Sequence, residues 1–178
     1  MNNKAFILIF ITVVLSCSRE WNNPLSPGKD NINLINVALA NSGGLAKAVS
    51  VGTYAGITHH PVNAIDGDSI SYWASNWSMP GWLQVEFNKI YSITKVGVWF
   101  GAHKHTFSIS LSTDGVNWTI VVPSRLSINN EGDVIPKHEL FNIPATDAKF
   151  IKCDIITTSA PSTHIFQSTI HELEAYGN

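Results

Sequence analysis

Short runs in which apolar and polar residues alternate recur along the chain from about residue 35 onward, with turn-forming residues between them. In residues 107–111 apolar side chains alternate strictly with serines, so one face of a strand should meet a core and the other should meet water. Asp114 and Gly115 then favour a turn into the next strand. No long helical period is present, so the pattern predicts an all-β domain, a sandwich or a barrel. The expected strands are residues 82–87, 93–100, 107–111, 118–122, 149–156 and 170–176.

The N-terminus carries a separate signal. Lys4 precedes an uncharged apolar run over residues 5–15, which is shorter than the roughly 20 residues that cross a bilayer. These features predict a secretory signal peptide. Residues 15–17 (Leu-Ser-Cys) resemble the lipobox of bacterial lipoproteins, which implies that Cys17 is lipidated and begins the mature chain. The alternative is an ordinary secretory signal in which Cys17 has no role.

Three segments follow from this reading. Residues 1–16 are the expected signal peptide, residues 17–34 a flexible lipid-anchored linker rich in Pro, Asn and Ser, and residues 35–178 a single domain without internal repeats. The expected location is the bacterial cell envelope, with the anchor in the outer membrane or at the cell surface.

The domain has one cysteine besides Cys17, so it cannot close an internal disulfide. That residue, Cys153, shares one strand face with Ile151 and Ile155, and no neighbour in the sequence offers an activating partner. A buried and unreactive thiol is therefore expected.

Charge narrows the classes of ligand. Charged residues make up 13% of the chain, against about 25% in an average domain. Removing residues 1–16 takes away only Lys4, which leaves 10 basic and 13 acidic residues and a net charge of −3 instead of −2. No basic surface for nucleic acid is indicated, and a largely neutral polar surface suits neutral ligands.

Several separated motifs carry a family resemblance. The motifs are residues 63–68 (Asn-Ala-Ile-Asp-Gly-Asp), 71–75 (Ser-Tyr-Trp-Ala-Ser), 80–87, 112–118 (Ser-Thr-Asp-Gly-Val-Asn-Trp), 148–152 and 172–177. In this order they resemble the discoidin domain, also called the coagulation factor five/eight type C domain, and the related family 32 carbohydrate-binding modules. The resemblance implies an all-β, antiparallel jelly-roll sandwich of the galactose-binding type.

The first motif has a chemistry of its own. Asp66, Asp68 and Ser71 place two carboxylates, a hydroxyl and several carbonyls in one tight loop, and such hard oxygen donors suit calcium. The resemblance implies a structural calcium that joins the last strand to this loop. Its implied ligands are Asn63, Asp66, Asp68, Ser71, His171 and Glu172, with Ser71 standing where the family more often has threonine. The alternative is an Asp-Gly turn without metal.

The tryptophans fall into two groups. Trp73, Trp82 and Trp118 lie inside family motifs and are expected to pack in the core or at its rim. Trp77 lies in a loop, where an exposed indole offers a platform for the face of a sugar. The alternative is that Trp77 folds back onto the core.

A second candidate loop contains His103, Lys104 and His105, which have hydrogen-bond donors for sugar hydroxyls. The alternatives are a solvated turn and a His-X-His pair for a transition metal, although the sequence offers no third ligand. His60, beside His59, is a further ligand-binding candidate, as is Phe166, near His164, because sugar-binding relatives often carry an aromatic residue in the last long loop. Either stretch can equally pack against the domain.

Two departures from the galactose-binding pattern stand out. Galactose-type modules commonly have a histidine just after the tryptophan that matches Trp73, where this chain has Ala74 and Ser75. They also commonly have an arginine near Phe100 and Gly101, and none is present. The resemblance therefore does not carry the identity of the ligand.

No nucleophile with a base, catalytic carboxylate pair or open metal site is identifiable, so we expect no enzyme activity. The predicted function is non-catalytic binding of a glycan or polysaccharide by an envelope lipoprotein, with many tethered copies raising the overall affinity. The alternative is an adhesion module that binds a cell-surface protein through the same loops. Binding to a lipid headgroup is less consistent, because Lys104 is the only basic residue in the candidate loops.

Overall fold

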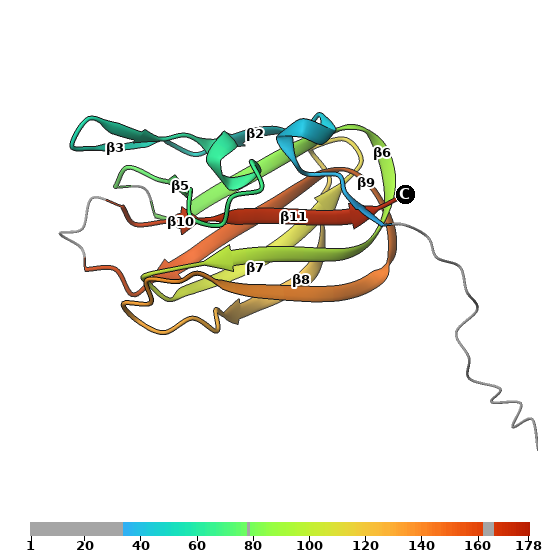
Figure 1. The fold of residues 1–178 in the computed structure, drawn as a ribbon. Coiled ribbons are helices and arrows are strands. Elements are labelled where there is room, and N and C mark those ends of the chain that lie inside the picture. Colours follow the sequence, from blue (N-terminus) through green and yellow to red (C-terminus); the bar gives the residue numbers. More distant parts are fainter. Residues whose placement is uncertain (1–33, 78, 162–165) are drawn as a thin grey trace, which may run out of the picture. The chain divides into compact units, whose positions relative to one another are not determined.

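The computed structural model describes residues 34–77, 79–161 and 166–178, which form a β-sandwich (Figure 1). Its strands are β1 (Ile35–Asn36), β2 (Leu45–Ala48), β3 (Gly52–Tyr54), β4 (Ile57–His59), β5 (Trp73–Ala74), β6 (Gly81–Phe100), β7 (His105–Ser112), β8 (Thr119–Leu126), β9 (Lys137–Thr158), β10 (Thr169–Ile170) and β11 (Glu172–Gly177). Two short 3₁₀ helices, η1 (Ala40–Ser42) and η2 (Pro61–Ala64), lie between the early strands. Among these described residues, no helix is long and apolar enough to cross a membrane.

Two long antiparallel strands, β6 and β9, build both layers of the sandwich. The first half of β6 pairs with the second half of β9. After a break in register between Glu86 and Tyr91, the second half of β6 pairs with the first half of β9. One layer contains β2, β7 and β8 beside these strands, and the other contains β1 and β11. The bend places the start and the end of β6 at the same end of the sandwich (Figure 1).

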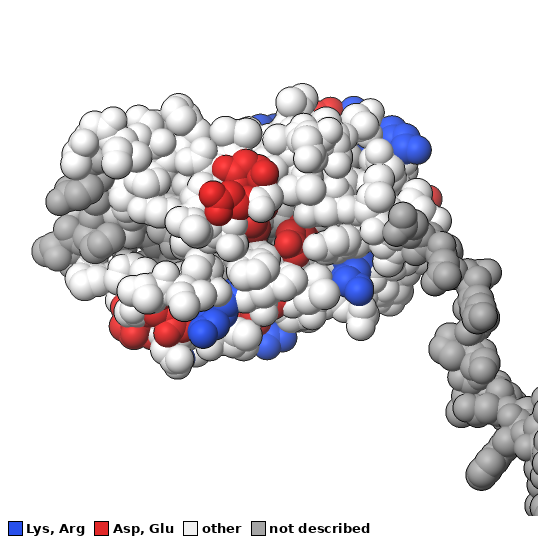
Figure 2. Space-filling view, in the orientation of Figure 1, with Lys and Arg blue, Asp and Glu red and all other residues white. Residues whose placement is uncertain are grey.

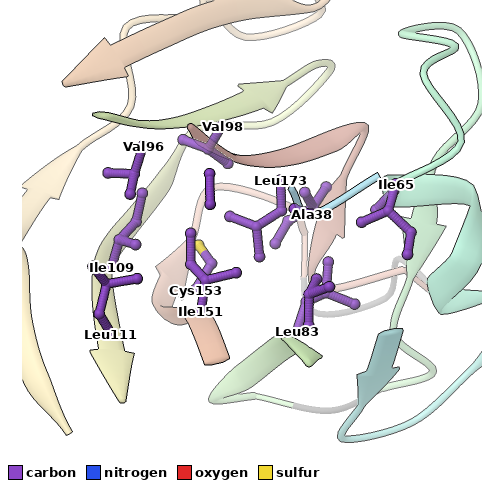
Figure 3. Packing of buried hydrophobic residues seen from close by; sticks show 14 of the residues in the cluster. Ala38, Ile65, Leu83, Val96, Val98, Ile109, Leu111, Ile151, Cys153 and Leu173 are labelled. Carbon is purple, nitrogen blue, oxygen red and sulfur yellow. The ribbon is translucent and has the colours of Figure 1, made fainter. Parts of the chain in front are cut away.

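The core lies between the layers (Figure 3). Leu83, Ile109, Ile151 and Cys153 enter it from one layer and Leu173 from the other, and all five are completely buried. Burial raises the pKa of the Cys153 thiol well above its ordinary value. A buried thiol without a cationic partner stays protonated, so this environment agrees with the prediction of an unreactive thiol.

The alternation predicted for residues 107–111 is present, but its polar face is not wet. Ser108 and Ser110 are 9% and 3% exposed. In register beside them lie Asp154 and Lys152, and the Lys152 ammonium is 4.8 Å from the centre of the Trp118 ring. These longer side chains cover the short serines, which the alternation alone does not reveal.

The turn after β7 forms where the sequence predicted it. Gly115 has a φ of +74°, a value that glycine adopts without strain. The Asp114 carboxylate accepts hydrogen bonds from the Val116 and Asn117 N–H groups, at 2.9 and 2.8 Å. These hydrogen bonds, first among them the one from Asn117, hold the Asp114 pKa well below its ordinary value.

Candidate functional site

The loops at one end of the sandwich form two bonded groups, and both lie at the left of Figure 1. The first, called the Trp77 group, consists of residues 50–52, 73–77, 79–80 and 166–170. The Ser75 N–H donates to the Ser168 carbonyl at 2.8 Å, and the Ser168 N–H donates to Ser75 Oγ at 3.0 Å. Ser50 adds two more links, because its carbonyl accepts from the Trp73 indole at 2.9 Å and its Oγ accepts from the Asn76 N–H at 3.0 Å.

Trp77 projects from this fastened loop. Its side chain is 55% exposed, so it does not fold back onto the core. Its backbone φ of +55° lies in the left-handed region, which costs energy for a bulky residue. Strain of this kind persists only where the surrounding structure holds it, and the hydrogen bonds of Ser50 and Ser75 supply that support.

Phe166 lies beneath the loop surface rather than on it. The residue is 7% exposed, and its ring meets the edge of His59 at 4.9 Å between centroids. It also covers Gly52, where a Cβ atom would come within 2.6 Å of the Phe166 ring. Phe166 therefore supports the Trp77 group and offers no exposed platform. His60 is exposed just before η2, and His164 lies outside the described residues, as does Cys17.

The second set of loops, called the His103 group, consists of residues 101–104, 127–133 and Ser159. Nδ1 of His103 lies 2.6 Å from a Glu131 carboxylate oxygen, and the Ser159 hydroxyl donates to the other oxygen. Hydrogen bonds from Ser159 and His103 lower the Glu131 pKa. The Asn129 amide ties this arrangement to the His103 carbonyl at 2.8 Å. His103 is thus oriented by its neighbours at the loop surface.

His105, the first residue of β7, is buried and does not reach this surface. It is 1% exposed, and burial lowers its pKa to about 3. Its Nε2 lies 3.3 Å from the Thr169 hydroxyl. The neutral imidazole is therefore part of the interior, and the structure does not bring it to the loop surface with His103. Among the described residues, no group of three His, Cys, Asp or Glu side chains is arranged to hold a metal ion.

A third feature lies beside β11. Oxygen atoms of Asn63, Asp66 and Asp68 surround the Ser71 hydroxyl, and we call these four residues the oxygen cluster. Ser71 Oγ lies 3.0 Å from the Asn63 carbonyl, 2.8 and 3.0 Å from the Asp66 carboxylate oxygens and 2.9 Å from the Asp68 carbonyl. A hydroxyl has a single proton, so it cannot donate to all of these acceptors at once.

The last strand reaches this oxygen cluster. Glu172 Oε1 accepts a hydrogen bond from the Gly67 N–H at 2.9 Å, whereas Glu172 Oε2 is buried without a partner among the described residues. Burial, followed by the nearby Asp66 carboxylate, raises the Glu172 pKa to about 8. His171 Nδ1 donates to the Ser69 carbonyl at 2.9 Å. The structure therefore gathers the side chains or backbones of the residues implied as calcium ligands into one region.

Comparison with known proteins identifies the family. The sequence profile of the F5/F8 type C-like family described as "NedA-like, galactose-binding domain" matches residues 63–153, more than half of the chain. The chain belongs to this family. No curated protein matches the sequence.

Solved structures of carbohydrate-binding modules resemble this galactose-binding domain. A pectin-binding module has a TM-score of 0.60 and 27% identity, over 74% of this chain and 88% of that one. Chitosan-binding module 2 from the chitosanase/glucanase of Paenibacillus sp. IK-5, in complex with chitotriose, has a TM-score of 0.61 and 26% identity, over 80% and 100%. The family 32 module of C. perfringens NanJ, in complex with galactose, shares the fold at 23% identity, with a TM-score of 0.59 over 80% and 99%.

The structure shows what surrounds the two places where the sequence departs from the galactose-binding pattern. Ala74 and Ser75 are completely buried, and Ala74 pairs with Thr169 of β10. Phe100 is buried, and a Cβ atom on Gly101 would come within 2.7 Å of the His171 imidazole. The histidine and the arginine of the galactose-binding pattern therefore have no equivalents at these positions.

Sequence analysis missed three residues that organise the loop end. Ser50, Glu131 and Ser159 each bond to a residue 26 or more positions away, for example Ser50 to Asn76 and Glu131 to both His103 and Ser159. No local motif marks them, because a serine or glutamate in a loop is unremarkable until the fold brings its partner close.

Proposed function

We propose that this domain binds carbohydrate without catalysis, at the loop end around Trp77. The observation that carries the proposal is the exposed Trp77 indole, held at a positive φ by a loop with fixed hydrogen bonds. An aromatic ring packs against the apolar face of a sugar, and a preorganised ring loses little entropy on binding.

Polar groups near such a platform supply orientation, because sugar hydroxyls both donate and accept hydrogen bonds. His103 and Glu131, held by Ser159, provide one oriented set at the same end of the sandwich (Figure 1). The exposed His60 is a further candidate contact. Phe166 and His105 contribute by packing beneath the loops.

The relatives support carbohydrate as the ligand class. The modules with 27% and 26% identity bind pectin and chitotriose, respectively. These ligands differ from each other, so the relatives favour a sugar ligand without selecting one.

A structural calcium is the second part of the proposal. The oxygen cluster, the His171 carbonyl and the Glu172 carboxylate would hold the ion, and carbonyl, carboxylate and hydroxyl oxygens are the ligands that calcium prefers. Two observations support it: the several acceptors around one Ser71 proton, and the unpartnered, buried Glu172 Oε2. A bound cation would neutralise the Asp66 and Glu172 carboxylates and stabilise the connection between the loop and β11.

The third part concerns location. We propose that Cys17, which lies outside the described residues, carries lipid and that residues 17–34 tether the domain to the bacterial cell envelope. Many copies on one surface would then raise the avidity of a weak individual site.

A glycan array with residues 17–178 in calcium-containing buffer tests the binding function. We expect reproducible binding that Trp77→Ala removes. Ile90→Ala is the matched control, because Ile90 is 54% exposed and falls within the register break between Glu86 and Tyr91. The bend of β6 at this break lies at the other end of the sandwich (Figure 1). A folded protein that binds no glycan would contradict the proposal and would point to a protein partner.

A further inference from the structure

A cavity on the face of the β11 layer is separate from the loop end. Its volume is about 290 Å³, and it opens between the turn at Gly67 and strand β11. Trp99, Tyr176, Glu172 and Glu174 line it, together with Asn36 and Leu39. None of its lining residues belongs to the Trp77 group or the His103 group.

Two carboxylates line the cavity, and among the described residues neither is paired with a lysine or an arginine. Glu172 and Glu174 are 3% and 8% exposed, and they lie on one face of β11. In the described part of the chain, neither carboxylate forms an ion pair with lysine or arginine. The one ion-pair contact is between His138 and Glu174, at 2.7 Å. Acidic side chains gather over this part of the molecule in Figure 2. A buried carboxylate without a lysine or arginine beside it is costly, so a cation that approaches Glu174 in the cavity is favoured.

Glu174 is held in a fixed position. Its Oε1 accepts a hydrogen bond from the Trp99 indole at 3.1 Å, and its Oε2 contacts His138 Nε2. The rings of Trp99 and His138 stack in parallel, with 4.4 Å between their centroids. This arrangement fixes both an anionic group and an aromatic wall before any ligand arrives, which reduces the entropy lost on binding.

The cavity keeps an acceptor for a ligand at Glu174. Each of its carboxylate oxygens holds one hydrogen-bond partner and has a further lone pair, so a ligand that binds there must donate a hydrogen bond. Trp99 and Tyr176 add two aromatic rings, which attract cations through their π-faces. Donor groups, positive charge and aromatic walls together describe a primary ammonium group.

We propose that this cavity binds the ammonium group of an amino sugar, with Glu174 as the anionic contact and Trp99 and Tyr176 as the aromatic walls. The volume lies near the lower end of small-molecule sites, roughly 300–1,000 Å³, and suits one sugar residue. The inference rests on the proposed function only in taking carbohydrate as the ligand class. The relative that binds chitotriose, at 26% identity, supports an amino sugar as the source of the ammonium.

Titration calorimetry with chitotriose and with its fully N-acetylated form tests the proposal, on residues 17–178 at about pH 6, below the usual pKa range of an amine. Calcium is present throughout, because Glu172 is also a proposed calcium ligand whereas Glu174, Trp99 and Tyr176 are not. We expect chitotriose to bind and Glu174→Gln to weaken it about tenfold or more, since a charge-assisted hydrogen bond is lost. The acetylated trimer should be insensitive to this substitution.

Glu86→Gln is the matched control, because Glu86 is a carboxylate paired with Lys149 on β6, outside this cavity. Tyr176→Leu removes a ring without changing the charge, and it should weaken the binding of chitotriose in the same way. This second variant keeps the test decisive if Glu174→Gln does not fold. Unchanged affinity in both variants, or an equal loss for the acetylated trimer, overturns the proposal. If only Trp77→Ala weakens chitotriose, the loop-end function stands and the cavity site is wrong. Binding of lysine peptides in place of chitotriose also overturns the amino-sugar assignment.

Discussion

Gly67 and Glu172 are joined by a hydrogen bond of 2.9 Å from the Gly67 N–H to Glu172 Oε1, although 105 positions separate them in the chain. His171 makes a second link, to the Ser69 carbonyl at 2.9 Å. The last strand of the domain is therefore fastened to an early loop through the region proposed to hold calcium. Any ion bound there stabilises a contact between distant parts of the chain, so its effect should appear in global stability.

Calcium should raise the thermal unfolding midpoint of the domain. At a free concentration of 100 times Kd the ion adds about 2.7 kcal/mol, which corresponds to roughly 5–10 °C for a domain of this size. Differential scanning fluorimetry with calcium and with excess chelator measures the shift. Asp66→Asn should abolish it, whereas Asp147→Asn, at an exposed carboxylate on β9 outside the oxygen cluster, should retain it. An identical midpoint with and without calcium in the unsubstituted protein would rule out the site.

The buried His105 should make the domain sensitive to acid. Its pKa is about 3 in the folded state and 6.5 in the unfolded state, so the unfolded chain binds the additional proton between these values. This contribution to stability is complete above pH 6.5 and is lost as the pH falls toward 3, roughly 5 kcal/mol in total.

Urea unfolding of the protein and of His105→Gln at several pH values isolates the contribution of His105 to the free energy of unfolding. The difference in free energy of unfolding between them should shrink as the pH falls, because glutamine does not titrate. His60→Gln is the control, since His60 is exposed, and it should leave the pH profile unchanged. A difference between the protein and His105→Gln that stays constant with pH would show that His105 does not remain neutral in the folded state.

The sequence predicted those features that depend on local pattern. The oxygen cluster spans residues 63–71, so its donors are visible as one motif, and the strand positions follow from alternation. His105 also had a usable signal, because it shares the parity of Phe107 and Ile109 along β7 and both of those residues are buried. The loop-surface role predicted for His105 ignored that parity.

Other features depend on the fold as a whole. Residues 82–87 and 93–100 were predicted as two strands, yet they are one bent strand, β6, because β9 bends with it and continues the pairing. The exposure of Trp77 depends on its backbone turn, and the burial of Phe166 depends on a glycine more than 100 positions earlier. No local pattern encodes such pairings, so a sequence reading could identify these aromatic residues without distinguishing the exposed one.

The Cys153 thiol should be unreactive in the folded protein. It is completely buried, and burial raises its pKa, so the thiolate population is very small. In residues 18–178, which lack Cys17, a thiol reagent should label less than a few per cent of the protein before unfolding and all of it in denaturant. Rapid labelling of the native domain at a rate independent of denaturant would contradict the burial of this side chain.

Gly52 should couple the stability of the loop end to ligand binding. A Cβ atom at this position would come within 2.6 Å of the Phe166 ring and 2.8 Å of the Ser75 carbonyl, so Gly52→Ala must displace the support of the Trp77 group. Overpacking of this kind costs roughly 1–3 kcal/mol, and we expect weaker glycan binding as well. Gly56→Ala serves as the comparison, because nothing lies within 4 Å of a Cβ there and its cost comes from the positive φ of +80° alone, about 1 kcal/mol. Chemical denaturation and glycan titration of both variants separate the two effects. If Gly52→Ala binds glycan as well as Gly56→Ala does, the position of Phe166 does not control the Trp77 platform.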